Sequence, residues 1–158
     1  MKLYHGSTID IYKIELSKSK PNKDFGIAFY LSDDEQQAFD MAQFRAEFDN
    51  SIPVVNVYDF EDTCLSELKV KRFDEYNEEW ARFVYDNRTS PNGMIAHEYD
   101  IIYGPIANDR IGAQITRYKQ GYISFEEFIK RIKYIGGITF QYAFCTQKAI
   151  DKLIKIRQ

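Results

Sequence analysis

The run Tyr4-His5-Gly6-Ser7 places an imidazole, a glycine and a hydroxyl group at consecutive positions near the start of the chain. A glycine has no side chain, so the backbone there can approach a ligand closely. Exposed backbone N–H and C=O groups can pair with a carboxamide, which offers one acceptor oxygen and two donor hydrogens. The same run is also typical of a plain strand and turn that carry a solvent-facing histidine.

A second run combines an aromatic side chain with a glycine and leads into an aromatic strand. Asp24-Phe25-Gly26 is followed by Phe29-Tyr30-Leu31-Ser32. A tyrosine near the end of such a strand can form a stacking platform for a flat ring. A buried aromatic strand without any ligand would show the same pattern.

The third run is Thr139 to Phe144, with the sequence TFQYAF. A strand has a period of two, which puts Gln141 on the face opposite Phe140 and Tyr142. A glutamine on a largely apolar strand needs a hydrogen-bond partner if it is buried. That partner could be protein, water or a ligand.

Hydrophobic periodicity predicts strands and helices that follow one another without a regular βαβ alternation. No glycine-rich phosphate loop follows a strand, which argues against Rossmann and P-loop proteins. We therefore expect an α+β fold. The expected strands are residues 2–5, 27–31, 54–58, 67–73, 99–103 (stopped by Gly104-Pro105) and 138–144, and the expected helices are residues 32–48, 75–87, 109–119, 124–134 and 146–156.

Several residues mark the expected helix ends. Ser32 with Glu35, and Ser124 with Glu127, have the spacing of a capping box. Gly121 is a natural stop for the helix over residues 109–119. The first helix is expected to bury the face formed by Ala38, Phe39, Ala42 and Ala46.

Composition describes one ordinary globular domain of 158 residues, 44% hydrophobic and 28% charged. The net charge of −3 gives no sign of a basic, DNA-binding body, although the chain is basic from Lys130 onward. Cys64 and Cys145 lie in no metal or redox spacing, so no metal site is expected. We see no signal peptide and no membrane span, and expect a cytoplasmic protein with reduced cysteines.

Together the three runs resemble the ADP-ribosyltransferase superfamily, in its His-Tyr-Glu branch of diphtheria-toxin-like and poly(ADP-ribose)-polymerase-like proteins. More closely, the chain is similar to a family of small bacterial proteins in that superfamily. The shared motifs are YHGS, DFGxxFYL, a W…F…NR helix, DIIxGPxAND and QxxF, which here are Tyr4–Ser7, Asp24–Leu31, Trp80–Arg88, Asp100–Asp109 and Gln141–Phe144.

The resemblance implies a single ADP-ribosyltransferase-like domain, a split sheet flanked by helices, that uses NAD as co-substrate. By the resemblance, His5 contacts the adenosine ribose, the Gly6 backbone holds the nicotinamide carboxamide and Ser7 positions the ribose. Tyr30 stacks on the nicotinamide ring, with Phe25 or Phe29 closing the pocket.

Gln141 stands where the branch has its catalytic glutamate, and this is the main departure from the pattern. A glutamine can still accept a hydrogen bond from the ribose, but it brings no charge to stabilise a developing cation. Either activity is modest and confined to single transfers, or another residue supplies the charge. Thr139 and Gln141 also replace the Glu-x-Glu pair of arginine-directed relatives, which weakens arginine as the acceptor.

Four further residues have open roles. Trp80 is expected in the core. Arg88 could be a surface cation or could hold the NAD pyrophosphate by a bidentate contact. Asp100 and Asp109 flank the Gly104-Pro105 turn and could cap helices or complete a site, and Asp109 suits a helix N-terminus best.

The resemblance therefore predicts a mono-ADP-ribosyltransferase. It also suggests that the protein is the toxin of a bacterial toxin–antitoxin or anti-phage system. The acceptor, any antitoxin and the oligomeric state stay open. An NAD glycohydrolase, with water as acceptor, is the second hypothesis. A degenerate NAD-binding or interaction module that has lost catalysis is the third, and Gln141 is the residue that favours it.

Overall fold

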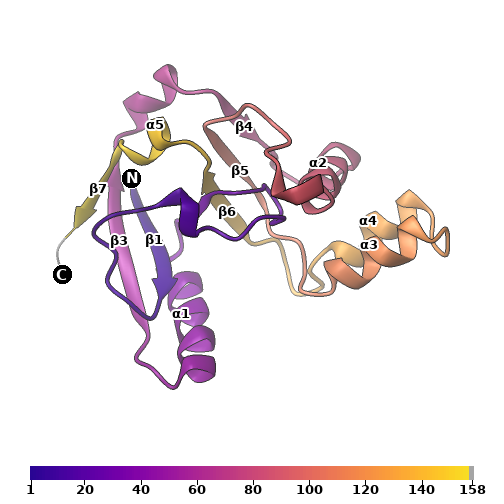
Figure 1. The fold of residues 1–158 in the computed structure, drawn as a ribbon, viewed down its shortest axis with the longest axis horizontal. Coiled ribbons are helices and arrows are strands. Elements are labelled where there is room, and N and C mark those ends of the chain that lie inside the picture. Colours follow the sequence, from indigo (N-terminus) through magenta and orange to yellow (C-terminus); the bar gives the residue numbers. More distant parts are fainter. Residues whose placement is uncertain (157–158) are drawn as a thin grey trace.

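The structure is a computed structural model that describes residues 1–156, and it is of the α+β class that the sequence predicts. Two sheets form its centre (Figure 1). One sheet is antiparallel, in the order β1-β3-β7, and the other has the order β2-β6-β5-β4, in which only β4 and β5 are parallel. No helix within residues 1–156 is long and apolar enough to cross a membrane.

The strands are β1 (Lys2–Ser7), β2 (Phe29–Leu31), β3 (Val54–Phe60), β4 (Val70–Arg72), β5 (Ile101–Pro105), β6 (Phe140–Phe144) and β7 (Leu153–Ile156). The helices are α1 (Glu35–Asp49), α2 (Glu78–Arg88), α3 (Ile111–Lys119), α4 (Phe125–Ile132) and α5 (Gln147–Ile150). Short 3-10 turns lie at η1 (Leu16–Lys18), η2 (Asp62–Glu67) and η3 (Pro91–Gly93).

Apolar side chains form two cores, one on each face of the four-stranded sheet. The first lies between the sheets and includes Leu3, Tyr58 and Phe144. The second lies between the four-stranded sheet and the helices α2 and α4. Trp80 is fully buried in this second core, as predicted, and its indole N–H donates to the carbonyl of Pro105 at 3.0 Å. The helices α3 and α4 pair as a hairpin that projects from one end of the molecule (Figure 1).

Helix α1 packs directly on β1 at Gly6. A Cβ atom on Gly6 would lie 2.0 Å from the carbonyl oxygen of Ala38 and 2.8 Å from the amide of Ala42, so only glycine fits at this crossing. The alanines of the predicted face, including Ala46, are buried there. The expectation for Phe39 is wrong, because its side chain is 38% exposed on the flank of the helix.

The helix ends follow the predicted capping pattern in part. Ser124 accepts from the backbone N–H of Glu127 at 3.1 Å, and Gly121 has a φ of +77° just after α3, both as expected. The capping box at Ser32 is wrong: α1 begins later, and the Asp34 carboxylate accepts from the first N–H groups of the helix. The Ser32 hydroxyl accepts from the N–H of Asp34 instead.

The C-terminal segment is the largest difference from the sequence prediction. A helix over residues 146–156 is wrong, because α5 ends at Ile150 and β7 follows and pairs with β3. Two of the four residues of β7 are β-branched, which is compatible with a strand, and the pairing with β3 decides it. β5 also runs through Gly104-Pro105 rather than stopping there, and the strand expected over residues 67–73 is confined to β4.

Candidate functional site

His5 lies in the middle of β1, and a hydrogen bond and a stacking contact fix the orientation of its ring. Its Nδ1 lies 2.6 Å from the carbonyl oxygen of Tyr30, and its ring stacks on Phe29 with 4.4 Å between centroids. Because a carbonyl can only accept, Nδ1 carries the proton and Nε2 is left as an acceptor. Burial lowers the pKa of His5 to about 4, with a smaller contribution from Arg45, so the ring is neutral at pH 7.

Gly6 presents its backbone at the edge of β1 that faces away from β3. Tyr4 exchanges both backbone hydrogen bonds with Ser32 on that side. Backbone groups of a strand alternate in direction, so those of Gly6 point to the same side as those of Tyr4. The guanidinium of Arg45 donates to the Gly6 carbonyl at 2.8 Å. Ser7 is buried, and its hydroxyl accepts from the N–H of Ile9.

The hydroxyl of Tyr30 fixes the loop that precedes β2. It donates to the Gly26 carbonyl at 2.7 Å and accepts from the N–H of Phe25 at 3.1 Å. Burial raises the pKa of Tyr30 well above its usual value. Phe25 itself is fully buried in the second core, so its ring does not close a pocket in this structure. Of the two candidates for that role, Phe29 is the partly buried one and already contacts His5.

Gln141 lies beside a buried carboxylate that the sequence analysis does not single out. Its Nε2 donates to Oδ2 of Asp24 at 3.3 Å, and the N–H of Ala107 donates to the same oxygen at 3.0 Å. Asp24 is only 5% exposed. Asp24 opens the DFG run of the sequence, but only the aromatic residue and the glycine of that run suggest a ligand. The carboxylate is the one buried charge that touches Gln141 within residues 1–156.

Arg88 is paired with the buried Asp24 and is not a plain surface cation. Its Nε and Nη2 atoms donate to Oδ1 of Asp24 at 2.8 and 2.6 Å, and its side chain is 27% exposed. The guanidinium is therefore the counter-ion of Asp24, and a contact of its remaining N–H groups with the NAD pyrophosphate stays a prediction. Two charge-assisted bonds of this kind fix the end of α2 against the loop before β2.

Register places Tyr30 and Gln141 on one face of neighbouring strands. Tyr30 of β2 is opposite Ala143 of β6, and Gln141 lies on the same face as Ala143 because the strand period is two. His5 is joined to the same point by its bond to the Tyr30 carbonyl. The three sequence motifs, which lie far apart in the chain, thus come together at one place in the fold.

Several cations lie near Lys23, the residue before Asp24. The pKa of Lys23 is lowered, first by partial desolvation and then by repulsion from Arg88, Arg45 and Lys20. Asp24 is the one carboxylate that offsets this repulsion at Lys23. A group of mutually repelling cations with a single counter-ion favours the binding of an anion.

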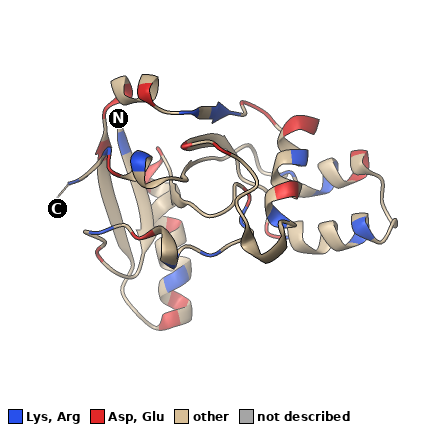
Figure 2. Cartoon of the chain, turned by 45° about the horizontal axis from the view of Figure 1, so that its top comes forward, with Lys and Arg blue, Asp and Glu red and all other residues tan. Residues whose placement is uncertain are grey.

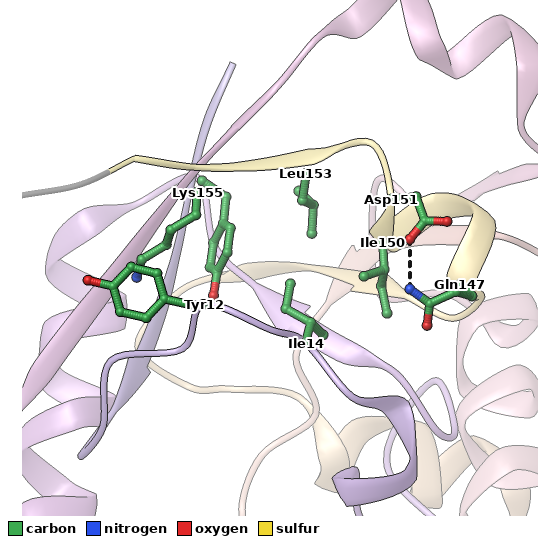
Figure 3. Close-up of a pocket in the computed structure, with 8 residues that line it drawn as sticks. Tyr12, Ile14, Gln147, Ile150, Asp151, Leu153 and Lys155 are labelled. Carbon is green, nitrogen blue, oxygen red and sulfur yellow. Dashed lines mark hydrogen bonds between the residues drawn. The ribbon is translucent and has the colours of Figure 1, made fainter.

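A small hollow of about 200 Å³ lies elsewhere, where the chain after β1 passes β7 (Figure 3). Its polar groups are already paired: Lys155 binds Asp10 and Asn56 at 2.6 Å each, and Gln147 donates to Asp151 at 2.7 Å. The hollow is therefore best explained as the seam that holds the C-terminal strand, and it contains none of the predicted site residues.

Of the two aspartates of the DIIxGPxAND motif, only Asp100 holds structural elements together. Asp100 accepts from the Thr146 hydroxyl at 2.7 Å and from the N–H of Lys69 at 2.9 Å, which joins α5 and β4 to β5. Asp109 is exposed and caps no helix, which corrects the expectation for it. The side chain of Asn108 accepts from the N–H of Arg110 at that turn instead.

Comparison with known proteins gives one match. The model of a family described as a protein of unknown function, DUF3990, matches residues 1–155. No curated protein and no solved structure matches the chain. The matched segment includes all the residues of the cluster formed by His5, Tyr30, Asp24 and Gln141.

Proposed function

The chain belongs to the DUF3990 family, and we propose that it is an NAD-dependent mono-ADP-ribosyltransferase with an ADP-ribosyltransferase-like core. The observation that carries the proposal is the meeting of His5, Tyr30 and Gln141 at one place, from strands β1, β2 and β6. A histidine and a tyrosine in this strand order are what the resemblance to the His-Tyr-Glu branch implies, and Gln141 stands at the position of the glutamate.

NAD would lie along the edge of β1 that faces away from β3, next to the bridge between Tyr4 and Ser32. The neutral His5 offers Nε2 as an acceptor for a hydroxyl of the adenosine ribose, and the Gly6 backbone faces the side where the nicotinamide carboxamide can pair with it. The Gly6 carbonyl has two lone pairs, so a carboxamide can share it with Arg45. Arg45 and Lys23 join Arg88 as candidate cations for the pyrophosphate.

Gln141 and Asp24 would act as a unit at the reacting ribose. The Gln141 N–H bond to Asp24 leaves Oε1 of the amide as an acceptor for a ribose hydroxyl. A carboxylate bound to the amide N–H polarises the amide and strengthens that acceptor. Asp24 is thus the candidate for the residue that supplies the missing negative charge.

The decisive experiment incubates the protein with NAD labelled in the adenosine part, with and without cell lysate. Label on macromolecules is expected for the wild type, and Gln141→Ala should abolish it while keeping the thermal shift that NAD induces. His5→Ala should lose the shift, and Gln120→Ala, at an exposed position after α3, is the matched control. Absence of both turnover and NAD-induced shift in the wild type contradicts the proposal.

One observation favours a second function. Arg88 compensates the charge of Asp24 with two short bonds, which leaves less of that charge for the reaction. An NAD glycohydrolase or a catalytically silent NAD-binding module would tolerate this. Free labelled ADP-ribose without labelled macromolecules identifies the first, and a thermal shift without turnover identifies the second. The toxin role rests on the resemblance alone, and growth arrest on induced expression in a bacterial host tests it.

A further inference from the structure

The hairpin of α3 and α4 carries a charge opposite to that of the rest of the chain. Residues 108–136 contain six Lys or Arg and three Asp or Glu, whereas the rest of the sequence contains 15 and 21. Figure 2 shows Lys and Arg on both helices of the hairpin. A patch of one sign on a protein of the other sign attracts a polyanion to that patch alone.

Five of these cations line a hollow of about 570 Å³. One wall comes from α3 and the other from α4 and the segment that follows it. The lining cations are Arg110, Arg117, Lys130, Arg131 and Lys133, and Asp109 is the one acid among the lining residues. Such a volume falls within the usual range of a ligand site.

Three of the five cations have no carboxylate within ion-pair distance among residues 1–156: Arg110, Arg117 and Lys133. Lys130 and Arg131 pair with glutamates one turn earlier on α4; the first contact is largely exposed and the second partly exposed, so both are weak. The groove thus offers charge that the protein itself leaves largely unpaired.

The spacing of the cations indicates a ligand with successive phosphates. Arg110 and Arg117 lie roughly 10 Å apart along α3, at about 1.5 Å per residue, so the cations are spread along the groove and not gathered at one point. The partly exposed ring of Tyr134 and the fully exposed Ile135 add an aromatic and an apolar surface at the edge of the groove. Cations that follow a backbone beside a ring for base stacking are the pattern of single-strand nucleic-acid sites.

The groove also lies next to the candidate site. Its residue Asn108 follows Ala107, whose N–H binds Asp24, and the segment after α4 leads into β6 and Gln141. We propose that this groove binds single-stranded nucleic acid. Its role would be to present the acceptor for ADP-ribose, and that role, unlike the binding, rests on the proposed function.

The transfer at such an acceptor balances without any further reactant. The bond between the ribose C1′ and the nicotinamide nitrogen breaks, and nicotinamide leaves with the electron pair. A nitrogen or oxygen of the nucleic acid forms the new bond to C1′ and releases its proton to solvent. Placing the acceptor beside Gln141 supplies the orientation that this step needs.

The test measures anisotropy of a fluorescent single strand of about 12 nucleotides, as DNA and as RNA, without NAD. Binding is expected at low salt and should weaken steeply as salt rises, with a logarithmic slope of about −0.7 per phosphate contacted. The variant Arg110→Ala/Arg117→Ala/Lys133→Ala should weaken binding roughly ten-fold or more. The control Lys13→Ala/Lys18→Ala/Lys69→Ala removes the same charge elsewhere and should change affinity less than about three-fold.

Several results overturn the proposal: no binding of either strand at low salt, or an equal loss in both triple variants. Loss of NAD binding in the groove variant, with oligonucleotide affinity unchanged, assigns the cations to the NAD pyrophosphate instead. Because the oligonucleotide assay contains no NAD, its result does not depend on whether the protein is an ADP-ribosyltransferase. His5→Ala should keep oligonucleotide binding, and labelled NAD then shows whether the bound strand becomes the acceptor.

Discussion

The side-chain amide of Gln141 donates to the carboxylate of Asp24 at 3.3 Å, across 117 positions of sequence. The contact joins β6 to the loop before β2. A glutamate at position 141 would instead place a second carboxylate beside the buried Asp24. Asp24 is held by Arg88 and by the N–H of Ala107 at the same time. The Asp24 carboxylate therefore joins its own loop to α2, to the segment after β5 and to β6.

Gln141→Glu should destabilise the protein at pH 7.5, by about 1 to 3 kcal/mol, because it places two carboxylates side by side. The native state then raises the pKa of one of them, so stability should recover as the pH falls toward 5. The exchange Asp24→Asn/Gln141→Glu keeps one carboxylate in the pair and should recover most of the loss. Denaturant unfolding at both pH values checks this, and a Gln141→Glu protein as stable as wild type at pH 7.5 contradicts it.

Arg88→Ala should cost about 3 to 5 kcal/mol, because it leaves the buried Asp24 without its counter-ion. Arg82 on the same helix is the matched control: it forms an exposed pair with Glu78, and Arg82→Ala should cost about 1 kcal/mol or less. Chemical denaturation of both variants gives the comparison. Equal effects at the two positions would mean that the bond between Arg88 and Asp24 contributes little.

Gly6→Ala should be among the most damaging single substitutions in the chain, because its Cβ would meet backbone atoms of α1 that cannot move alone. We expect a loss of about 3 kcal/mol or more, measured as a lower melting temperature. A Cβ atom on Gly112 in α3 would meet nothing within 4 Å, and Gly112→Ala should stabilise by about 0.5 to 1 kcal/mol. A well-tolerated Gly6→Ala would show that α1 can move away from β1 at this crossing.

His5 should make stability fall in mild acid. Its folded-state pKa of about 4 lies below the ordinary 6.5, so the unfolded chain takes up a proton first as the pH falls. The stabilisation is complete above about pH 6.5 and is lost as the pH falls toward 4. Between pH 7.5 and 4.5, wild type should lose about 2 to 3 kcal/mol more than His5→Asn. His97, whose pKa is also lowered by burial, is present in both proteins and cancels; parallel pH profiles would refute the assignment.

Local patterns predict those elements whose signal is complete within a few residues. Alternation defines β1, helical spacing defines α2, and Ser124 at the start of α4 accepts from the N–H of Glu127 as its sequence indicates. The sequence does not reveal β7, because Thr146 does begin a helix and nothing local says that it ends after one turn. Pairing with β3 decides the strand, and such long-range pairing is not visible in the sequence of the strand itself.

In the candidate site, too, local motifs are visible in the sequence and long-range contacts are not. The motifs mark His5, Tyr30 and Gln141 as residues of interest, and the fold brings them together. The role of Asp24 is not visible in the sequence, because its importance comes from Arg88 and Gln141, neither of which is near it in the chain. The sequence suggests Gly6 as a position for close approach of a ligand, while the structure shows that α1 makes a close approach to it.

Strand order also determines when the site can exist during synthesis. β2 pairs as a strand with β6, so Tyr30 has no strand partner until the chain has reached Phe144. Contacts that close so long a loop form late, and folding dominated by them is slow. A ribosome-bound chain therefore carries no assembled cluster until Phe144 has emerged from the ribosome, so no earlier nascent chain presents the site.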